Sequence, residues 1–266
     1  MNFRFGRKKY RYMWETAFAF FGRKRRTQSV SQAKYEDSWE KRHQKLYDMS
    51  FYTREVSLDG RPAIQSSADD YKLLISEFDS LIKSLNPKRV LEVGSGNGLM
   101  ILGLAMLNPN IEWVGVELTE SGVESSRHLL EKPPADALRY MTGVDANILK
   151  SVNIRFVQGN ALSLPFEDSS FDGVFTCTAI EQIPRDYMQA FAEIRRVTSK
   201  YAFFYEGFNE ANNILQRIQR WVIDDFRGSF REVGKVGFDI MSYRKLGLDK
   251  IAHCNALLVC RKTKSV

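Results

Sequence analysis

Short apolar segments of strand length alternate with helical segments along most of the chain, and this alternation constrains the fold most. Parallel strands need a crossover of a dozen or more residues, usually a helix, and such crossovers are right-handed. The pattern therefore predicts an α/β fold, in which a mostly parallel sheet is covered by helices on both faces. We expect strands at Arg89–Val93, Ile111–Glu117, Ile154–Gln158, Phe171–Thr176, Tyr201–Gly207 and Ala256–Arg261. We expect helices at Tyr35–Asp48, Ala68–Ser84, Asn97–Leu107, Glu120–Glu131, Tyr187–Val197 and Asn212–Phe226.

A glycine-rich loop follows the first of these strands, in the stretch VLEVGSGNG over residues 90–98. Ligands of parallel α/β sheets bind beyond the carboxyl ends of the strands, so this loop is a candidate binding site. A phosphate-binding P-loop requires GxxxxGK[ST], and no Lys-Ser or Lys-Thr pair follows these glycines. A dinucleotide fingerprint requires GxGxxG, whereas Leu99 occupies the place of its third glycine. Both of these nucleotide-binding motifs are therefore disfavoured.

The remaining pattern, an acidic residue two positions before a GxGxG run, resembles the first motif of class I S-adenosylmethionine-dependent methyltransferases. Later segments match that family in order: Glu117 ends the second strand, Asn160-Ala161 follows the third, and FDGVFTCTAIEQIP and AFAEIRRVTSKYAFFYEG come next. The resemblance covers about residues 88–207 and is nearest to the small-molecule, type 11-like branch with quinone and sterol methyltransferases. It implies a Rossmann-like, seven-stranded, mostly parallel sheet, with N-terminal helices that form a cap.

The same resemblance implies the cofactor, S-adenosylmethionine, and the residues that bind it. Glycines lack Cβ, so their backbone can lie against the amino-acid part of the cofactor. Free N–H groups at a helix start can face its carboxylate, and a strand-end carboxylate can accept hydrogen bonds from its ribose hydroxyls. We predict cofactor contacts from Glu92, Gly94, Ser95, Gly96, Asn97, Gly98, Glu117, Leu118, Asn160, Ala161 and Thr176. No metal site is expected, because the three Cys and three His lack ligand spacing.

Two departures from the family bear on the chemistry. Asn160 stands where an Asp is usual, yet an amide oxygen can still accept a hydrogen bond from an exocyclic amine. The turn after the fourth strand reads Glu181-Gln182, so the histidine that the family often has there is absent. Transfer from an activated sulfonium gains much of its rate from proximity and alignment, so a base is not obligatory. The candidates for a base or an acceptor contact are Glu181, Glu206 and Tyr205.

The acceptor is expected to be a small molecule, a lipid-linked molecule or a glycan. The NPPY or DPPY sequence that grips a flipped base or amide is replaced by TCTAI, which argues against amino-methylating nucleic-acid and glutamine enzymes. Two alternatives stay open. One is an RNA methyltransferase anchored by a basic segment, and the other is a non-catalytic module that binds S-adenosylmethionine. The sequence sets no oligomeric state.

Positive charge is concentrated at the N-terminus. The net charge is +7, and residues 1–45 hold 13 Lys/Arg against 4 Asp/Glu, whereas the rest hold 26 against 28. Residues 1–33 are predicted to be a basic, flexible arm, either a solvated tail, a peripheral contact with anionic lipid or a nucleic-acid arm. The near-neutral remainder gives no sign of a nucleic-acid groove. Met13–Gly22, the best apolar run, is about half the length that spans a bilayer. We therefore expect a cytoplasmic protein, peripheral at a membrane surface if the arm binds lipid.

The predicted organisation places a cap before the cofactor-binding domain. Residues 34–86 are expected to be helical and to close over the cofactor, with aromatic walls for an acceptor pocket from Trp39, Tyr47, Phe51 and Tyr52. Residues 87–266 form the cofactor-binding methyltransferase domain. Within it, residues 133–152 are interpreted as a structural or oligomeric insertion and residues 208–250 as a second cover for the acceptor.

Overall fold

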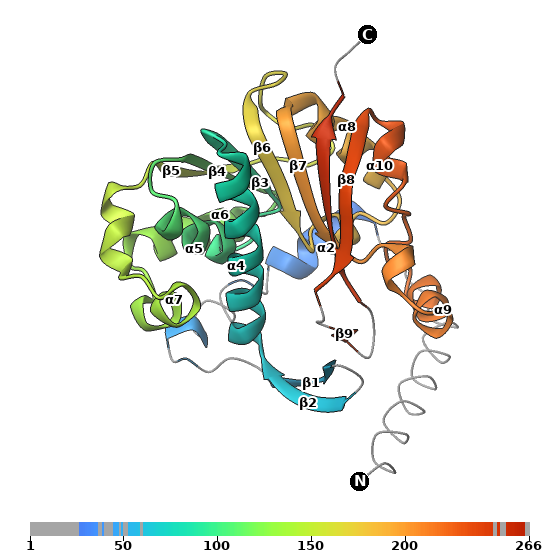
Figure 1. The fold of residues 1–266 in the computed structure, drawn as a ribbon, viewed down its shortest axis with the longest axis horizontal. Coiled ribbons are helices and arrows are strands. Elements are labelled where there is room, and N and C mark those ends of the chain that lie inside the picture. Colours follow the sequence, from blue (N-terminus) through green and yellow to red (C-terminus); the bar gives the residue numbers. More distant parts are fainter. Residues whose placement is uncertain are drawn as a thin grey trace.

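The computed structural model describes residues 27–36, 39, 45–47, 49, 53–58, 61–246, 249–250 and 254–263. Its centre is one seven-stranded sheet (Figure 1). In spatial order the strands are β5 (Ile154–Gln158), β4 (Glu112–Glu117), β3 (Arg89–Val93), β6 (Phe171–Cys177), β7 (Thr198–Glu206), β10 (Ala256–Lys262) and β8 (Phe238–Lys245). The first five are parallel, and β10 is antiparallel to both β7 and β8. The expected seven-stranded, mostly parallel sheet is confirmed.

Helices cover both faces of this sheet, as the sequence predicted (Figure 1). Side chains alternate between the two faces along a strand, so Phe203 of β7 packs into one apolar cluster with Phe78 and Ile101. The neighbouring Phe204 packs into a second cluster with Phe191 on the opposite face. The helices are α4 (Ser67–Leu85), α5 (Leu99–Leu107), α6 (Glu120–Glu131), α7 (Ala135–Thr142), α8 (Tyr187–Val197), α9 (Ile214–Val222) and α10 (Glu232–Lys235). Short 3₁₀ turns are η1 (Ala146–Ser151), η2 (Ile180–Gln182) and η3 (Asn209–Ala211).

Helix α5 starts directly after the glycine loop and anchors it to the core. Its sequence, LMILGLAML, is apolar on every side, and every residue except Leu107 is buried. A helix that is apolar all round must be enclosed, and α5 accordingly packs among α4, α6, α7 and β4. The loop is therefore tied at one end to a strand and at the other to a fully enclosed helix.

Two segments that the sequence analysis set apart belong to the folded body. Within residues 133–152, α7 and η1 bury Ala137, Leu138 and Leu149 in the core, and the interpretation of this insertion as structural or oligomeric stays a prediction. Within residues 208–250, β8 is the edge strand of the main sheet. It was missed because most of its side chains are exposed, so no apolar face marks it in the sequence.

The N-terminal part differs from the helical cap that was predicted. Helix α2 (Gln28–Glu36) includes residues 28–33, which belong to the segment predicted to be a flexible arm. Strands β1 (Thr53–Leu58) and β2 (Arg61–Ser66) pair as an antiparallel hairpin in a segment that was predicted to be helical. Strand β9 (Asp249–Lys250) pairs with β1 and completes a three-stranded sheet. The intervening Asp59-Gly60 pair is typical of hairpin turns and was the missed signal. Residues 1–26 lie outside the described residues. Among those described, no helix is long and apolar enough to cross a membrane.

Candidate functional site

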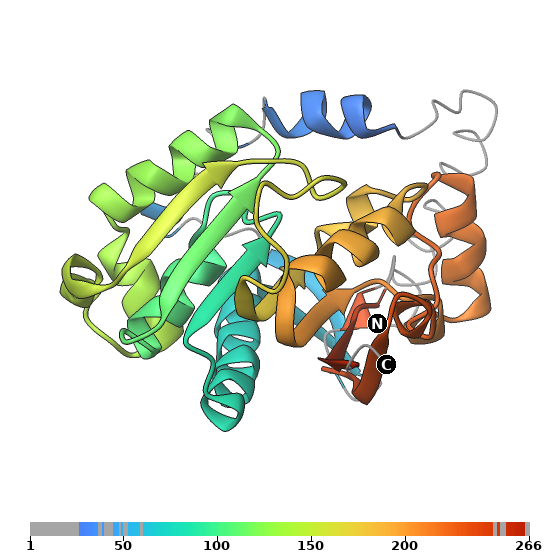
Figure 2. The same cartoon turned by 90° about the horizontal axis from the view of Figure 1, so that it is seen from above.

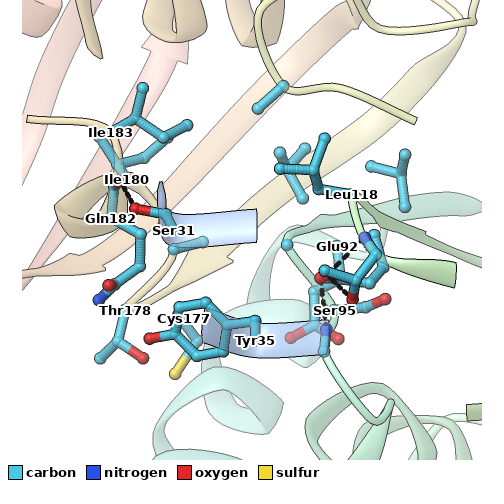
Figure 3. Close-up of a pocket in the computed structure, with 18 of the residues that line it drawn as sticks. Ser31, Tyr35, Glu92, Ser95, Leu118, Cys177, Thr178, Ile180, Gln182 and Ile183 are labelled. Atoms are coloured by element: carbon cyan, nitrogen blue, oxygen red, sulfur yellow. Dashed lines mark hydrogen bonds between the residues drawn. The ribbon is translucent and has the colours of Figure 1, made fainter. Parts of the chain in front are cut away.

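A cavity of ≈ 180 Å³ lies beyond the carboxyl ends of β3, β4, β5 and β6 (Figure 3). This is the edge of the sheet where α/β proteins bind ligands. Ligand pockets usually measure about 300–1,000 Å³, so the cavity is narrow. Its walls are Ser31, Gln32, Tyr35, Trp39, Tyr71, Glu92, Val93, Gly94, Ser95, Gly96, Asn97, Met100, Val116, Glu117, Leu118, Thr119, Gly159, Asn160, Ala161, Cys177, Thr178, Ala179, Ile180, Gln182 and Ile183.

The glycine loop forms one wall in a conformation that only glycine adopts easily. Gly94, Gly96 and Gly98 have φ of 77°, 56° and 78°, a left-handed region that side chains with a Cβ rarely enter. A Cβ on Gly94 would lie 2.5 Å from the Cβ of Ala179, and one on Gly98 would lie 2.8 Å from the Phe156 ring. The loop therefore leaves bare backbone at the cavity and brings neighbouring elements close to it.

Glu92 is a buried carboxyl group at this cavity. It is 2% exposed, and among the described residues its Oε2 has no hydrogen-bond partner. Burial raises the pKa of Glu92 well above its usual range and the nearby Glu117 carboxylate adds to this, whereas the backbone N–H of Ile101 acts in the opposite direction. An acceptor atom buried without a donor is costly, so this position is suited to a cationic ligand group.

Glu117, at the end of β4, accepts hydrogen bonds on both of its oxygens, one from the glycine loop and the other from Thr119 at the start of α6. Oε2 accepts from the N–H of Gly96 at 3.0 Å, and Oε1 accepts from the N–H and the hydroxyl of Thr119 at 3.0 and 2.7 Å. A carboxylate offers about four acceptor sites. Glu117 thus holds the glycine loop in place and can accept one further hydrogen bond. The resemblance implied that it accepts hydrogen bonds from both ribose hydroxyls of the cofactor.

Helix α2 and Trp39 close the cavity from the outside. Ser31 donates to the carbonyl of Gln182 at 3.1 Å, and the Ser121 N–H donates to Glu36 at 2.9 Å, so α2 spans from η2 to α6. The indole of Trp39 donates to the Thr119 hydroxyl at 3.2 Å and stacks on Tyr35 with ring centroids 5.7 Å apart. Figure 2 shows α2 lying across this end of the sheet.

The predicted cofactor residues converge on this cavity, with two exceptions. All of them line it except Gly98, which is the N-cap of α5, and Thr176, which is buried in β6. Asn160 uses its side-chain Oδ1 to accept from the Leu162 N–H at 2.9 Å, which shapes the turn after β5. Beside it, Leu118 and Ala161 give the cavity an apolar side.

The predicted catalytic candidates are absent from the lining described above. The Glu206 carboxyl accepts from the N–H groups of Ala179, Ile180 and Glu181 at 3.0–3.1 Å, so it caps turn η2. Burial and the adjacent Glu181 carboxyl raise the pKa of Glu206 above its usual range. Tyr205 is buried in the core on the α4 side of the sheet. A role as base for these residues stays a prediction, and the geometry gives it no support.

Several cavity residues were missed by the sequence analysis. Thr178 and Ile183 follow the carboxyl end of β6, so the strand-end rule could have found them. Thr178 has φ of 57°, a strained conformation that clusters at functional sites and that no sequence signal indicated. Of the four predicted aromatic walls, Trp39 lines the cavity, whereas Tyr47 donates to the Lys132 carbonyl elsewhere. The other two, Phe51 and Tyr52, lie outside the described residues.

No metal chemistry is indicated in the described part of the chain. No group of three or more His, Cys, Asp or Glu side chains there could hold an ion. None of the three cysteines is in a disulfide, and Cys177 is half-buried in the cavity wall.

Comparison with known proteins identifies the domain. The family model described as Methyltransferase domain (Methyltransf_11) matches residues 91–205. The demethylmenaquinone methyltransferase of Deinococcus radiodurans is 34% identical over 112 residues, which are 42% of this chain and 39% of the relative. The phthiotriol/phenolphthiotriol dimycocerosates methyltransferase 1 of Mycobacterium ulcerans is 26% identical over 66% of this chain and 56% of the relative. The matches thus span about half of these relatives or less.

The solved structures add the fold. Magnesium protoporphyrin IX methyltransferase from Synechocystis PCC 6803, crystallised with bound SAH, superimposes with a TM-score of 0.60. The alignment covers 88% of this chain and 99% of that one at 11% identity. The fold of this chain is therefore that of class I methyltransferases. Residues 91–205, somewhat less than half of the chain, match the methyltransferase domain family, whose cofactor is S-adenosylmethionine.

The residues present suit that cofactor. The partnerless Oε2 of Glu92 is placed to accept from an ammonium group, which is the cationic end of the cofactor's amino-acid part. The bare backbone at Gly94 and Gly96 provides a cradle that a Cβ would fill. Leu118 and Ala161 provide apolar contact for a purine ring.

Proposed function

We propose that this chain is a methyltransferase that moves a methyl group from S-adenosylmethionine to a small-molecule or lipid-linked acceptor. The observation that carries the proposal is the buried Glu92 carboxyl, which lines the cavity together with the bare glycine loop and whose Oε2 has no partner among the described residues. Together these features form a site for a molecule that has both a cation and a nucleoside. The family match over residues 91–205 supports the same activity.

In this proposal the residues of the chain bind the cofactor, orient it toward the acceptor and enclose both. When bound, S-adenosylmethionine would supply a methyl group on a sulfonium: the sulfur–methyl bond would break as the bond to the acceptor atom forms, and the neutral thioether would leave. Glu92 holds the amino group and Glu117 the ribose, while α2 and Trp39 keep bulk water from the cavity. Alignment in a closed site supplies much of the rate for such a reaction. Glu181, Glu206 and Tyr205 then support the cavity walls and do not move protons.

The apolar residues among the remaining lining support the acceptor class. Outside the predicted cofactor set, the lining includes Tyr35, Tyr71, Met100, Cys177 and Ile183, together with polar residues such as Gln32, Thr178 and Gln182. Aromatic and thioether side chains suit an apolar ring or chain. The named substrates of the curated relatives, demethylmenaquinone and phthiotriol dimycocerosates, are consistent with this chemistry.

A two-step experiment tests the proposal. First, S-adenosylmethionine and its demethylated product should raise the melting temperature, because a ligand that binds only the folded state stabilises it. No shift at millimolar concentration would refute the cofactor assignment. Second, tritiated methyl transfer into fractionated extract should label the lipid or small-molecule fraction. Label in RNA would favour the RNA methyltransferase alternative, and binding without any label would favour the non-catalytic module.

Residues 1–33 enter this proposal as a peripheral membrane contact, which their basic and aromatic composition supports. Deleting them should weaken sedimentation with anionic vesicles. Unchanged sedimentation would remove this part of the proposal, and salt-sensitive RNA retention lost with the same deletion would favour a nucleic-acid arm.

A further inference from the structure

Helix α9 is oriented opposite to an ordinary surface helix, because its polar face is buried and its apolar face is exposed. Gln216 and Arg220 are 8% and 1% exposed. By contrast, an apolar row along and just after the helix is between 43% and 69% exposed; it consists of Ile214, Leu215, Ile218 and Ile223. Surface helices normally face their apolar stripe to the core, so this row is suited to something outside the fold.

The buried polar contacts fix this orientation. Gln216 completes a capping box with Asn213 and donates to the Cys254 sulfur at 3.4 Å. Arg220 donates from Nε to the Phe226 carbonyl at 2.8 Å and lies so close to Gly207 that a Cβ there would sit 2.1 Å from its guanidinium. Rotating α9 to bury the row would pull Arg220 out of this niche and leave buried polar groups without partners.

The charge beside the row is positive. Within α9 there are two arginines and no acid. Arg217 is exposed, its Nε donates to the backbone carbonyls of Asn209 and Asn212, and among the described residues it has no carboxylate within 4 Å. The two acids that follow the helix are buried and paired, Asp224 lying 3.9 Å from Arg227 and Asp225 3.7 Å from Arg220, so Arg217 is the cation on this surface that carries unbalanced charge. An open hollow beside the row combines two arginines with apolar side chains, and it is lined by Asn209, Arg217, Ile218, Trp221 and Arg227.

The position of α9 relates this surface to the cavity. Strand β7 ends at Glu206 beside the end of β6, and the chain continues from there through η3 into α9. The helix therefore lies at the same end of the sheet as the cavity, and Figure 1 shows α2 and α9 at that end. A partner bound to α9 would therefore lie at the same end of the sheet as the cavity.

We infer that α9 docks on an anionic lipid bilayer. Its apolar row enters the boundary between headgroups and acyl chains, and Arg217 and Arg227 face the lipid phosphates. Amphipathic helices with arginine beside apolar side chains bind in this way, with strength set by apolar area and by attraction to anionic lipid. This inference concerns docking and does not depend on methyl transfer.

Vesicle sedimentation of the full chain tests it. The probes are phosphatidylcholine vesicles with and without phosphatidylglycerol. Wild type should partition about tenfold more strongly into the anionic vesicles at low salt. The double variant Leu215→Glu/Ile218→Glu should lower this partition about tenfold, because it removes two apolar contacts and adds two repelled charges. The matched control is Ile240→Glu/Met241→Glu on β8, which changes the charge equally on comparably exposed side chains and should change partition less than about twofold.

Three outcomes would overturn the inference. If both double variants lower partition equally, only net charge matters. If neither does, α9 is not a contact. If the wild-type chain does not bind the vesicles but self-associates, and Leu215→Glu/Ile218→Glu abolishes the self-association, a second copy of the chain covers the row. Thermal unfolding and S-adenosylmethionine binding, measured on the same variants, should match wild type. These readouts separate a docking defect from misfolding and from failure of the proposed function.

Discussion

Glu92 and Glu206 are two buried carboxyl groups at the same edge of the sheet, and their surroundings differ in the number of donors. Glu206 receives three backbone N–H groups and holds turn η2. Glu92 has an oxygen with no partner among the described residues, and it faces the cavity. Burial raises the pKa of both. A saturated carboxyl group organises the chain, whereas an unsaturated one of equal burial is available to a ligand.

The largest expected effect is on stability, from Glu206→Ala. This change leaves three buried N–H groups without an acceptor, each worth about 1–3 kcal/mol. We expect the free energy of unfolding to fall by about 3–5 kcal/mol, measured by urea denaturation. Glu206→Gln keeps one acceptor oxygen, so its free energy of unfolding should fall by less than that of Glu206→Ala. A stable Glu206→Ala variant that lost only methyl transfer would instead return Glu206 to the role of a base.

Glu92→Gln should affect cofactor affinity and spare the fold. It removes a charge-assisted contact worth about 1.5–3 kcal/mol, so the Kd for S-adenosylmethionine should rise about 10- to 100-fold in calorimetry. The free energy of unfolding without cofactor should stay level or increase, because a carboxyl group whose ionisation is opposed by burial is replaced by a neutral amide. Glu124→Gln, at an exposed site on α6, is the control. Equal affinities in both variants would contradict the assignment of Glu92 to the ammonium group.

The raised pKa of Glu92 gives a pH test with a defined sign. An ammonium ligand binds the carboxylate form, so affinity should fall as pH drops through the raised pKa, and binding should release a proton. Calorimetry in two buffers of different ionisation enthalpy measures that release. Without cofactor, the same group stabilises the fold below its usual pKa, and this contribution is lost as pH rises through the raised value. Glu92→Gln should abolish the proton release, and its persistence would point to another group.

The smallest effect is expected from Trp39→Phe. Phe keeps a ring over the glycine loop but cannot donate to the Thr119 hydroxyl, a neutral hydrogen bond worth about 1 kcal/mol. Cofactor affinity should change less than about fivefold, measured by the same calorimetry. A loss of cofactor affinity as large as that expected for Glu92→Gln would show that the indole contacts the cofactor directly.

The sequence predicted the central sheet and the glycine loop well, for physical reasons. Strands buried on both faces, such as β6 with FDGVFTC, leave continuous apolar runs, and glycines at 94, 96 and 98 mark backbone that needs positive φ. Edge strand β8 leaves no such trace because its side chains are mostly exposed.

Roles that depend on hydrogen-bond partners could not be predicted. Glu206 was a candidate for chemistry because it follows a strand, and only three-dimensional contacts show that backbone N–H groups occupy it. Ser31 and Tyr35 reach the cavity from a Ser/Gln-rich stretch with no apolar periodicity, so their placement had no local signal.

The approach of Trp39 to the glycine loop also has a genetic consequence. A Cβ on Gly96 would lie 2.4 Å from the indole, so Gly96→Ala creates a collision in addition to its backbone strain. Trp39→Ala would remove the collision and leave only the strain. The two positions should therefore behave as a suppressor pair, in which a second mutation at 39 partly restores what a first mutation at 96 destroys.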